Sequence, residues 1–107
     1  MDLKQYQIVL VNLDRTIGSE MKKTRPCVII SPDEMNKYLG TIVIAPMTST
    51  SKPYPTRIEV RLKKTKGYVV LDQIRTVDRR RIVKVLDALS EKQIIIVKEI
   101  LKETYVD

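Results

Sequence analysis

Apolar residues recur along the chain in short segments whose pattern is typical of β-strands. Residues 6–14 (YQIVLVNLD) form a nearly continuous apolar run, which favours a buried strand. Residues 56–62 (TRIEVRL) alternate between polar and apolar positions, which indicates one buried and one solvent-facing side. By the same criteria we predict strands at 6–14, 25–31, 41–47, 56–62, 68–74 and 82–86.

The segments between these strands carry the signals of turns, loops and one short helix. Residues 15–24 are polar and form a loop long enough to serve a function, and 63–67 form a turn. Residues 75–81 are a basic connection. At 31–38 (SPDEMNKY) we expect a short helix with Ser31 as its N-cap and Pro32 at its first position.

The C-terminal segment is predicted to be a helix. Ser90 followed three residues later by Gln93 matches a capping box. Apolar residues then recur at helical spacing at Ile94, Val97, Ile100 and Leu101, and Ile95 and Ile96 widen this stripe. We expect the helix to pack deeply on the sheet; the alternative is that part of the stripe makes a subunit contact.

These elements predict a mainly β protein with a short helix after the second strand and a C-terminal helix. Short strands joined by turns favour a strongly curved sheet or a small barrel. Parallel βαβ units are not expected, because only one connection could hold a helix. We expect one domain over residues 1–107.

Charge narrows the class of partner. The chain has 20 Lys and Arg against 13 Asp and Glu, a net charge of +7. Such an excess favours nucleic acid, an anionic membrane surface or an acidic protein. No signal peptide is recognisable and the apolar runs are too short to span a bilayer, so we expect a soluble cytoplasmic protein.

Missing residue types restrict the chemistry. The chain has no His, which excludes His-based acid–base catalysis, and with Cys27 as its one cysteine we expect no metal site and no cofactor. It also has no Trp or Phe, so any stacking on nucleic-acid bases would depend on Tyr or Arg.

Groups suited to cleaving RNA without His stand near predicted strand ends. Such cleavage needs cations or donors on the phosphate, a base for the 2′-OH and a proton for the leaving oxygen. Arg25 opens the second strand, Thr48 and Ser49 follow the third, and Glu20 lies in the loop before Arg25. Each is equally consistent with ordinary surface or turn chemistry, so the residues alone indicate a basic β-rich domain that binds a polyanion.

Three ordered segments resemble the MazF/PemK toxin family. Residues 18–36 (GSEMKKTRPCVIISPDEMN) are similar to its Gly-Ser-Glu…Arg-Pro signature. Residues 44–60 (IAPMTSTSKPYPTRIEV) are similar to its Pro-x-Thr-[Thr/Ser] signature. Residues 67–82 (GYVVLDQIRTVDRRRI) resemble its Asp-Gln-Ile-Arg-Thr block. Each segment is weak by itself, but the ordered set is specific.

The resemblance implies a small SH3-like β-barrel of the CcdB/MazF type, assembled as a homodimer and inhibited by an acidic antitoxin. It implies metal-independent, sequence-specific cleavage of single-stranded RNA to 2′,3′-cyclic phosphate and 5′-hydroxyl ends. It assigns the catalytic Arg to Arg25, the catalytic Thr to Thr48 and a loop Glu to Glu20. We expect Glu20 to orient Arg25 or to act as the base, and prefer the first role.

Further residues are candidates for contact with RNA: Lys22, Lys23, Ser49, Lys52, Tyr54, Arg57, Gln73 and Arg75. For most of them an ordinary solvated side chain is as good an explanation. Arg79, Arg80 and Arg81 form a dense basic group that a turn could expose. Cys27 stands where the family places small apolar residues, so we expect a core residue and not a nucleophile.

One position departs from the family pattern. Family members often begin the first strand with Gly-Asp after a basic residue, whereas this chain has Tyr6 and Gln7 after Lys4. The departure concerns the first turn and its contacts near the site.

Two other classes stay open. One is a gyrase-poisoning toxin of the CcdB type, against which the absence of Trp and the Glu-Thr-Tyr-Val-Asp end argue. The other is a non-catalytic SH3-like module that binds RNA or an acidic protein.

Overall fold

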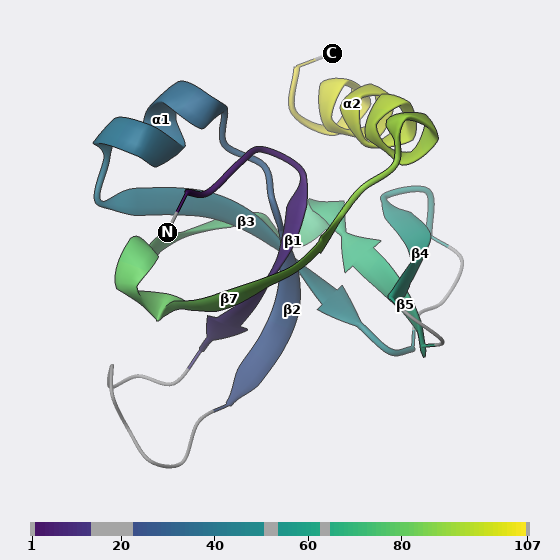
Figure 1. The fold of residues 1–107 in the computed structure, drawn as a ribbon. Helices are drawn as coiled ribbons and strands as arrows, with labels where there is room; N and C mark the ends of the chain where they lie inside the picture. The colour runs from purple at the N-terminus through teal and green to yellow at the C-terminus, as the bar shows by residue number, and fades with distance from the viewer. Residues whose placement is uncertain (1, 14–22, 51–53, 63–64, 107) are drawn as a thin grey trace.

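The computed structural model describes residues 2–13, 23–50, 54–62 and 65–106. In this part of the chain seven strands, two α-helices and two single-turn 3-10 helices follow one another (Figure 1). The strands are β1 (Gln7–Asn12), β2 (Thr24–Ile29), β3 (Thr41–Thr48), β4 (Arg57–Leu62), β5 (Thr65–Val70), β6 (Arg75–Asp78) and β7 (Ile82–Ala88). The helices are α1 (Asp33–Tyr38), η1 (Leu71–Gln73), η2 (Arg79–Arg81) and α2 (Glu91–Tyr105).

The described strands form one curled antiparallel sheet in the order β4-β5-β3-β2-β1-β7, and β6 adds to β3. Strand β3 is long enough to take part in two ladders: its first half pairs with β6, and its end pairs with β5. The sheet therefore bends at β3, as Figure 1 shows. The predicted mainly β fold, with a short helix after the second strand and a helix at the C-terminus, is confirmed.

Two hydrophobic cores lie on the two faces of the central strands. The α2 core contains Val97 of α2 together with residues of β1 to β5, among them Val28 and Ala45. The β6 core contains Val77 of β6 together with Cys27 and Ile44. Neighbouring residues of β2 thus alternate between the two cores, as the period of a strand requires. The middle of β2 and β3 is buried on both sides for this reason.

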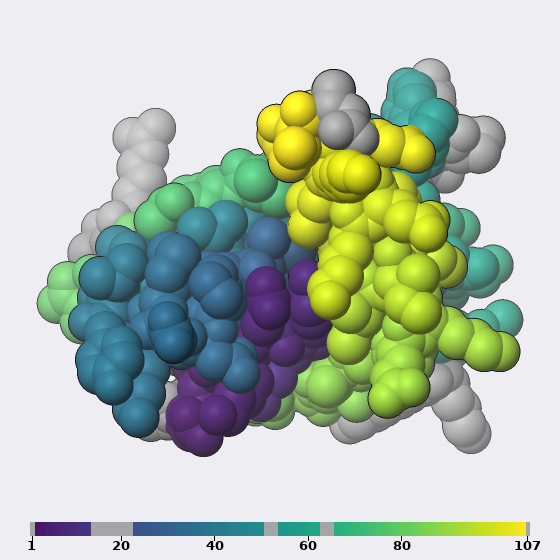
Figure 2. Space-filling model, turned by 90° about the horizontal axis from the view of Figure 1, so that it is seen from above, coloured from purple at the N-terminus to yellow at the C-terminus, as the bar shows by residue number. Residues whose placement is uncertain are grey.

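The C-terminal helix covers one face of the sheet (Figures 1 and 2). Its capping box is present: the Ser90 hydroxyl accepts from the Gln93 amide, and the Gln93 side chain accepts from the Ser90 amide. Only Val97 of this helix is buried, whereas Ile95 and Ile96 are 58% and 44% exposed in the single chain. The helix packs on the sheet as expected, but the expectation of deep packing over the whole stripe is wrong. No helix in the described ranges is long and apolar enough to cross a membrane.

Strand boundaries were mispredicted between β4 and β7. The strand expected at 68–74 begins at Thr65 and ends at Val70, so residues 65–67, expected to lie in a turn, belong to β5. Residues 75–81, expected to be a connection, include β6, which pairs with Thr41–Ile44 of β3. Three of the four β6 residues are polar or charged and only Val77 enters a core, so the apolar pattern does not show this strand.

Tyr6 has a left-handed backbone, with φ at 68°. This is the position where family members often have glycine, which adopts such a backbone without a steric cost. The strained backbone is held from both sides, because the Tyr6 amide donates to the Ile29 carbonyl at 2.7 Å and the Tyr6 carbonyl accepts from the Leu89 amide at 2.9 Å. The side chain is only 9% exposed and belongs to the α2 core, so its burial offsets part of the strain.

Ser31 does not cap α1, contrary to the sequence prediction; the N-cap is Pro32, without a side-chain hydrogen bond. The Ser31 hydroxyl instead donates to Oδ1 of Asn36 and accepts from the Val43 amide at 3.1 Å. Nδ2 of Asn36 donates to the Ser31 carbonyl at 2.9 Å. Asn36 has no exposed surface, so this pair ties α1 to β3 through hydrogen bonds made away from water.

We predict that Asn36→Leu destabilises the protein by about 1–3 kcal/mol, because the Ser31 hydroxyl and carbonyl lose buried partners. Urea unfolding would measure the change. Glu34→Gln, on an exposed position of the same helix, should change stability by less than about 0.5 kcal/mol. Equal stability of Asn36→Leu and the parent would contradict the structural role of this pair.

Candidate functional site

Arg25 and Thr48 lie at the same end of the β2–β3 ladder. The last pair of that ladder joins Cys27 and Pro46. Arg25 precedes Cys27 by two residues and Thr48 follows Pro46 by two residues, so in antiparallel strands both lie beyond this pair on the same side. The structure brings together two residues that are 23 positions apart in the sequence.

The two side chains also share a face of the sheet. Side chains two residues apart along a strand point to the same face. Arg25 therefore shares the face of Cys27 in the β6 core, and Thr48 shares that of Ile44. Consistent with this, Arg25 pairs across β1 with Val11, another residue of the β6 core. Arg25 is exposed and Thr48 half-buried, so the β6 core ends at this edge in a polar, solvent-accessible surface.

Arg75 approaches the same edge from β6. It pairs with Ile44 of β3, which places it on the face that carries Cys27. Burial raises the pKa of the Cys27 thiol to about 12, while the charges of Arg25 and Arg75 act on it in the opposite direction. Both guanidinium groups are therefore close enough to the thiol to influence its ionisation. Two cationic side chains therefore lie near Cys27, on the same face of the sheet as Thr48.

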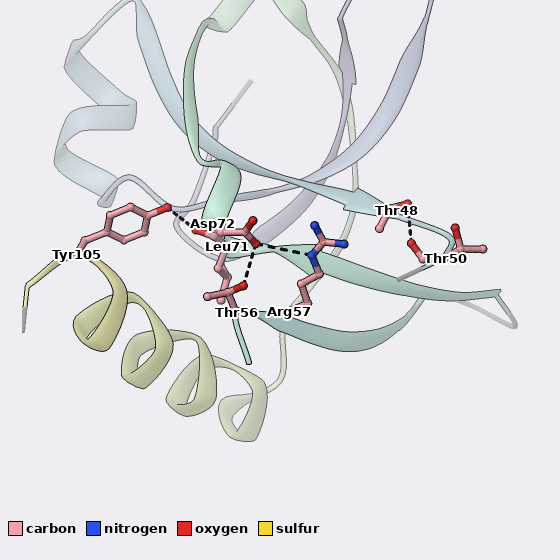
Figure 3. Close-up of polar contacts among 7 residues, drawn as sticks. All are labelled: Thr48, Thr50, Thr56, Arg57, Leu71, Asp72 and Tyr105. Atoms are coloured by element: carbon pink, nitrogen blue, oxygen red, sulfur yellow. Dashed lines mark hydrogen bonds and ion pairs between the residues drawn. The ribbon is translucent and has the colours of Figure 1, made fainter. Parts of the chain in front are cut away.

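The turn after β3 presents two hydroxyl groups. The Thr48 hydroxyl donates to the Thr50 carbonyl at 3.1 Å, as Figure 3 shows, which fixes its position in the free protein. Ser49 is exposed next to it. A bound phosphate oxygen would accept the Thr48 proton in place of the Thr50 carbonyl, an exchange that needs only rotation of the hydroxyl.

Arg57 and Tyr54, two predicted RNA contacts, interact with each other at the start of β4. The Arg57 guanidinium lies 4.9 Å from the centre of the Tyr54 ring. Nε of Arg57 is 3.7 Å from Oδ1 of Asp72, which also accepts from the Thr56 hydroxyl at 2.9 Å (Figure 3). Arg57 thus connects β4 to η1, and its charge is partly balanced by Asp72.

Of the remaining predicted site residues, Lys23 and Gln73 are described by the structure and three others are not. Lys23 is exposed just before β2, two residues before Arg25, and Gln73 is exposed at the end of η1, two residues before Arg75. Glu20, Lys22 and Lys52 lie outside the described residues.

Arg79, Arg80 and Arg81 make intramolecular contacts at η2. Arg79 donates to the carbonyl of Asn36, and Arg81 donates to the carbonyl of Asn12 at 3.2 Å. Nη2 of Arg80 is 2.9 Å from Oδ2 of Asp78, and this hydrogen-bonded pair lowers the pKa of Asp78 to about 2. The basic group therefore holds the β6–β7 connection in place.

Tyr68 was not identified from the sequence. It pairs directly with Thr48 across the β3–β5 ladder, which places both side chains on the same face. The segment containing it was correctly expected to be a strand, but nothing in the sequence indicates which strand it pairs with or in what register. Tyr68 is associated with the candidate site only because it pairs with Thr48.

A cavity of about 340 Å³ opens at this edge of the sheet. Met47 of its lining belongs to the α2 core, and Thr48 borders both this cavity and the face that carries Arg25. Its remaining lining residues are Pro26, Ser49, Leu62, Lys66, Gly67 and Leu86.

The arrangement at this edge suits a phosphate diester. Two guanidinium groups supply forked donors with a fixed positive charge, and a threonine hydroxyl adds a further donor. Such donors stabilise negative charge that develops on phosphate oxygens during displacement at phosphorus. In the described ranges no group of three or more Cys, Asp or Glu side chains is arranged to hold a metal ion.

We predict that Cys27 does not react with a thiol reagent such as Ellman's reagent in the folded protein at pH 8, because it is fully buried with a pKa near 12. Absorbance after addition of the reagent would follow the reaction, and the thiol should react once the protein is unfolded in guanidinium. Rapid labelling of the folded protein would contradict its place in the β6 core.

Comparison with known proteins agrees with the geometry. Residues 4–105 match the family described as PemK-like, MazF-like toxin of type II toxin-antitoxin system. The chain is 35% identical over 99 residues to Endoribonuclease MazF of Staphylococcus epidermidis, which covers 87% of this chain and 82% of that protein.

Solved structures of similar proteins share the fold. A MazE-MazF complex from Deinococcus radiodurans superposes with a TM-score of 0.80 at 25% identity, covering 96% of this chain and 95% of that one. Mycobacterium tuberculosis toxin MazF-mt6 superposes with a TM-score of 0.78 at 20% identity, covering 91% of this chain and 93% of that one. The chain belongs to the family of PemK-like, MazF-like toxins of type II toxin-antitoxin systems, as its three sequence segments predicted.

Proposed function

We propose that the protein is the toxin of a toxin–antitoxin pair and acts in the cytoplasm as a single-domain, sequence-specific endoribonuclease on single-stranded RNA. The observation that supports this most directly is the placement of Arg25, Arg75 and Thr48 on one face of the sheet near the same edge. The relative from Staphylococcus epidermidis is named an endoribonuclease. The net charge of +7 is suited to a polyanionic substrate.

The proposed reaction is an internal displacement at phosphorus that requires no metal ion. The 2′-oxygen of the ribose attacks the adjacent phosphorus while its proton passes to a base. The bond from phosphorus to the 5′-oxygen breaks, and that oxygen takes up a proton. The products are a 2′,3′-cyclic phosphate and a 5′-hydroxyl end.

Each residue of the edge has a role in this scheme. The Arg25 and Arg75 guanidinium groups stabilise the charge that gathers on the phosphate oxygens as the fifth bond forms. The Thr48 hydroxyl donates a hydrogen bond to one of these oxygens. Glu20, from the loop before β2, orients Arg25. Lys22, Lys23, Ser49, Lys52 and Gln73 bind the flanking RNA.

We further propose that the protein forms a homodimer and binds an acidic antitoxin. Homologous complexes include a MazE-MazF assembly from Deinococcus radiodurans. The exposed side chains of Ile95 and Ile96 on α2 and of Val83 and Val85 on β7 supply apolar surface for such contacts. The positive charge favours an acidic partner.

We predict that Arg25→Ala and Thr48→Ala each lower the rate of RNA cleavage by about 100-fold or more, since removal of one preorganised donor costs roughly 3 kcal/mol of transition-state stabilisation. Gel analysis of a long transcript, incubated with the protein and EDTA, would measure the rates and test metal independence.

Variants on the exposed face of α2 provide matched controls. Lys98→Ala and Thr104→Ala remove a cation and a hydroxyl far from this edge and should cleave like the parent protein. Wild-type rates in Arg25→Ala would overturn the site assignment. Binding of the transcript by the parent without cleavage would favour the non-catalytic module, and trapping of gyrase on DNA would favour the CcdB-type activity.

A further inference from the structure

We propose that Tyr68 is a substrate-binding residue whose ring stacks on the RNA base next to the scissile phosphate. This proposal rests on the proposed endoribonuclease function. It adds Tyr68, from β5, to the residues of the candidate site. The structural basis is the direct pairing of Tyr68 with Thr48.

Cross-strand pairing brings the two side chains close. Residues directly opposite in an antiparallel ladder have Cβ atoms about 4.5–5.5 Å apart on the same face of the sheet. Thr48 shares its face with Arg25, so Tyr68 shares that face too. A phosphate held between Arg25 and the Thr48 hydroxyl would therefore lie next to the position that Tyr68 occupies on β5.

The composition of the chain makes this ring important. Single-stranded RNA is held largely by stacking of its unpaired bases on aromatic side chains. This chain has no Phe, Trp or His, so only its five tyrosines can supply such a ring.

The other four tyrosines are engaged or remote. Tyr6 is buried in the α2 core, and the hydroxyl of Tyr105 donates to the Leu71 carbonyl at 2.6 Å. Tyr38 lies at the end of α1, and the ring of Tyr54 packs against Arg57 at 4.9 Å. Tyr54 stays a candidate for a base further along the RNA, whereas Tyr68 is the tyrosine paired with Thr48.

The neighbours of Tyr68 on its other side are compatible with RNA. Glu59 pairs with Tyr68 across the β4–β5 ladder, and its carboxylate alone would repel a phosphate backbone. Nζ of Lys66, two residues before Tyr68, is 2.9 Å from Oε1 of Glu59. The hydrogen bond to Glu59 raises the pKa of Lys66, so the ammonium stays charged and offsets the carboxylate.

The test compares Tyr68→Leu, which removes the ring, with Tyr68→Phe, which keeps the ring and removes the hydroxyl. The probe is a short RNA spanning a cleavage site mapped on a transcript, made uncleavable by one 2′-deoxy sugar. Two versions of this RNA are made, with the fluorescent base 2-aminopurine immediately before or immediately after the cleavage point. Stacking of the tyrosine ring on this base quenches its fluorescence.

We expect Tyr68→Leu to weaken binding about 5- to 140-fold, the equivalent of 1–3 kcal/mol for one stacked base, and to lose the quenching at one of the two positions. Tyr68→Phe should bind within about twofold of the parent. Tyr38→Leu, which removes a 75% exposed ring from α1, is the matched control and should leave binding unchanged. Thermal unfolding of each variant shows that the fold is kept.

The outcomes separate this proposal from the proposed function. Parent-like binding and quenching in Tyr68→Leu, with RNA cleavage intact in the parent, overturns the stacking role alone. An equal loss in Tyr68→Phe and Tyr68→Leu also overturns it, because the hydroxyl and not the ring would then be required. A parent protein that neither binds nor cleaves RNA overturns both proposals.

Discussion

The antiparallel pairing of β2 with β3, buried on both faces, is the constraint on which the rest of the structure depends. Val28 and Ala45 face one core, and Cys27 and Ile44 face the other. A shift of the register by one residue would move the shifted strand's side chains to the opposite core and break the packing of both cores. The register is therefore strongly specified, and it also places Arg25 and Thr48 at one end of the ladder.

The same pairing places the guanidinium groups of Arg25 and Arg75 on one face of the sheet while leaving both side chains exposed to solvent. Arg25 and Arg75 stand where the β6 core meets solvent, so they stay hydrated while they act on the space beside Thr48. Cys27, directly inside this edge, is buried and its thiol stays protonated. The packing of the β6 core fixes the strands that carry Arg25 and Arg75. The two arginines therefore need not contribute to the free energy of folding.

The sequence was sufficient for features that depend on local pattern. The alternation in 56–62 predicted β4, and Ser90 with Gln93 predicted the start of α2. It was insufficient where a residue's role depends on a distant partner. Strand β6 escaped detection because its polar residues are held by pairing with β3, and Tyr68 was missed because its importance comes from the register against Thr48.

Ser31 and Tyr6 are both held by contacts with residues outside their own segments. Ser31 has the residue type of an N-cap, yet its hydroxyl donates to Oδ1 of buried Asn36 and accepts from the Val43 amide. Tyr6 adopts a backbone usual for glycine because hydrogen bonds to Ile29 and Leu89, and burial of its ring, hold it there. Local propensity is overruled in both cases by tertiary contacts.

If Arg25 and Thr48 act together on one phosphate, a double-mutant cycle will show that their contributions to RNA cleavage are coupled. Cleavage rates would be measured for Arg25→Lys, Thr48→Val and the double variant. If both side chains contact the same phosphate, their effects should be coupled by about 0.5–3 kcal/mol, so that the double variant departs from the product of the single effects. Independent, multiplicative effects of the two substitutions would contradict the account.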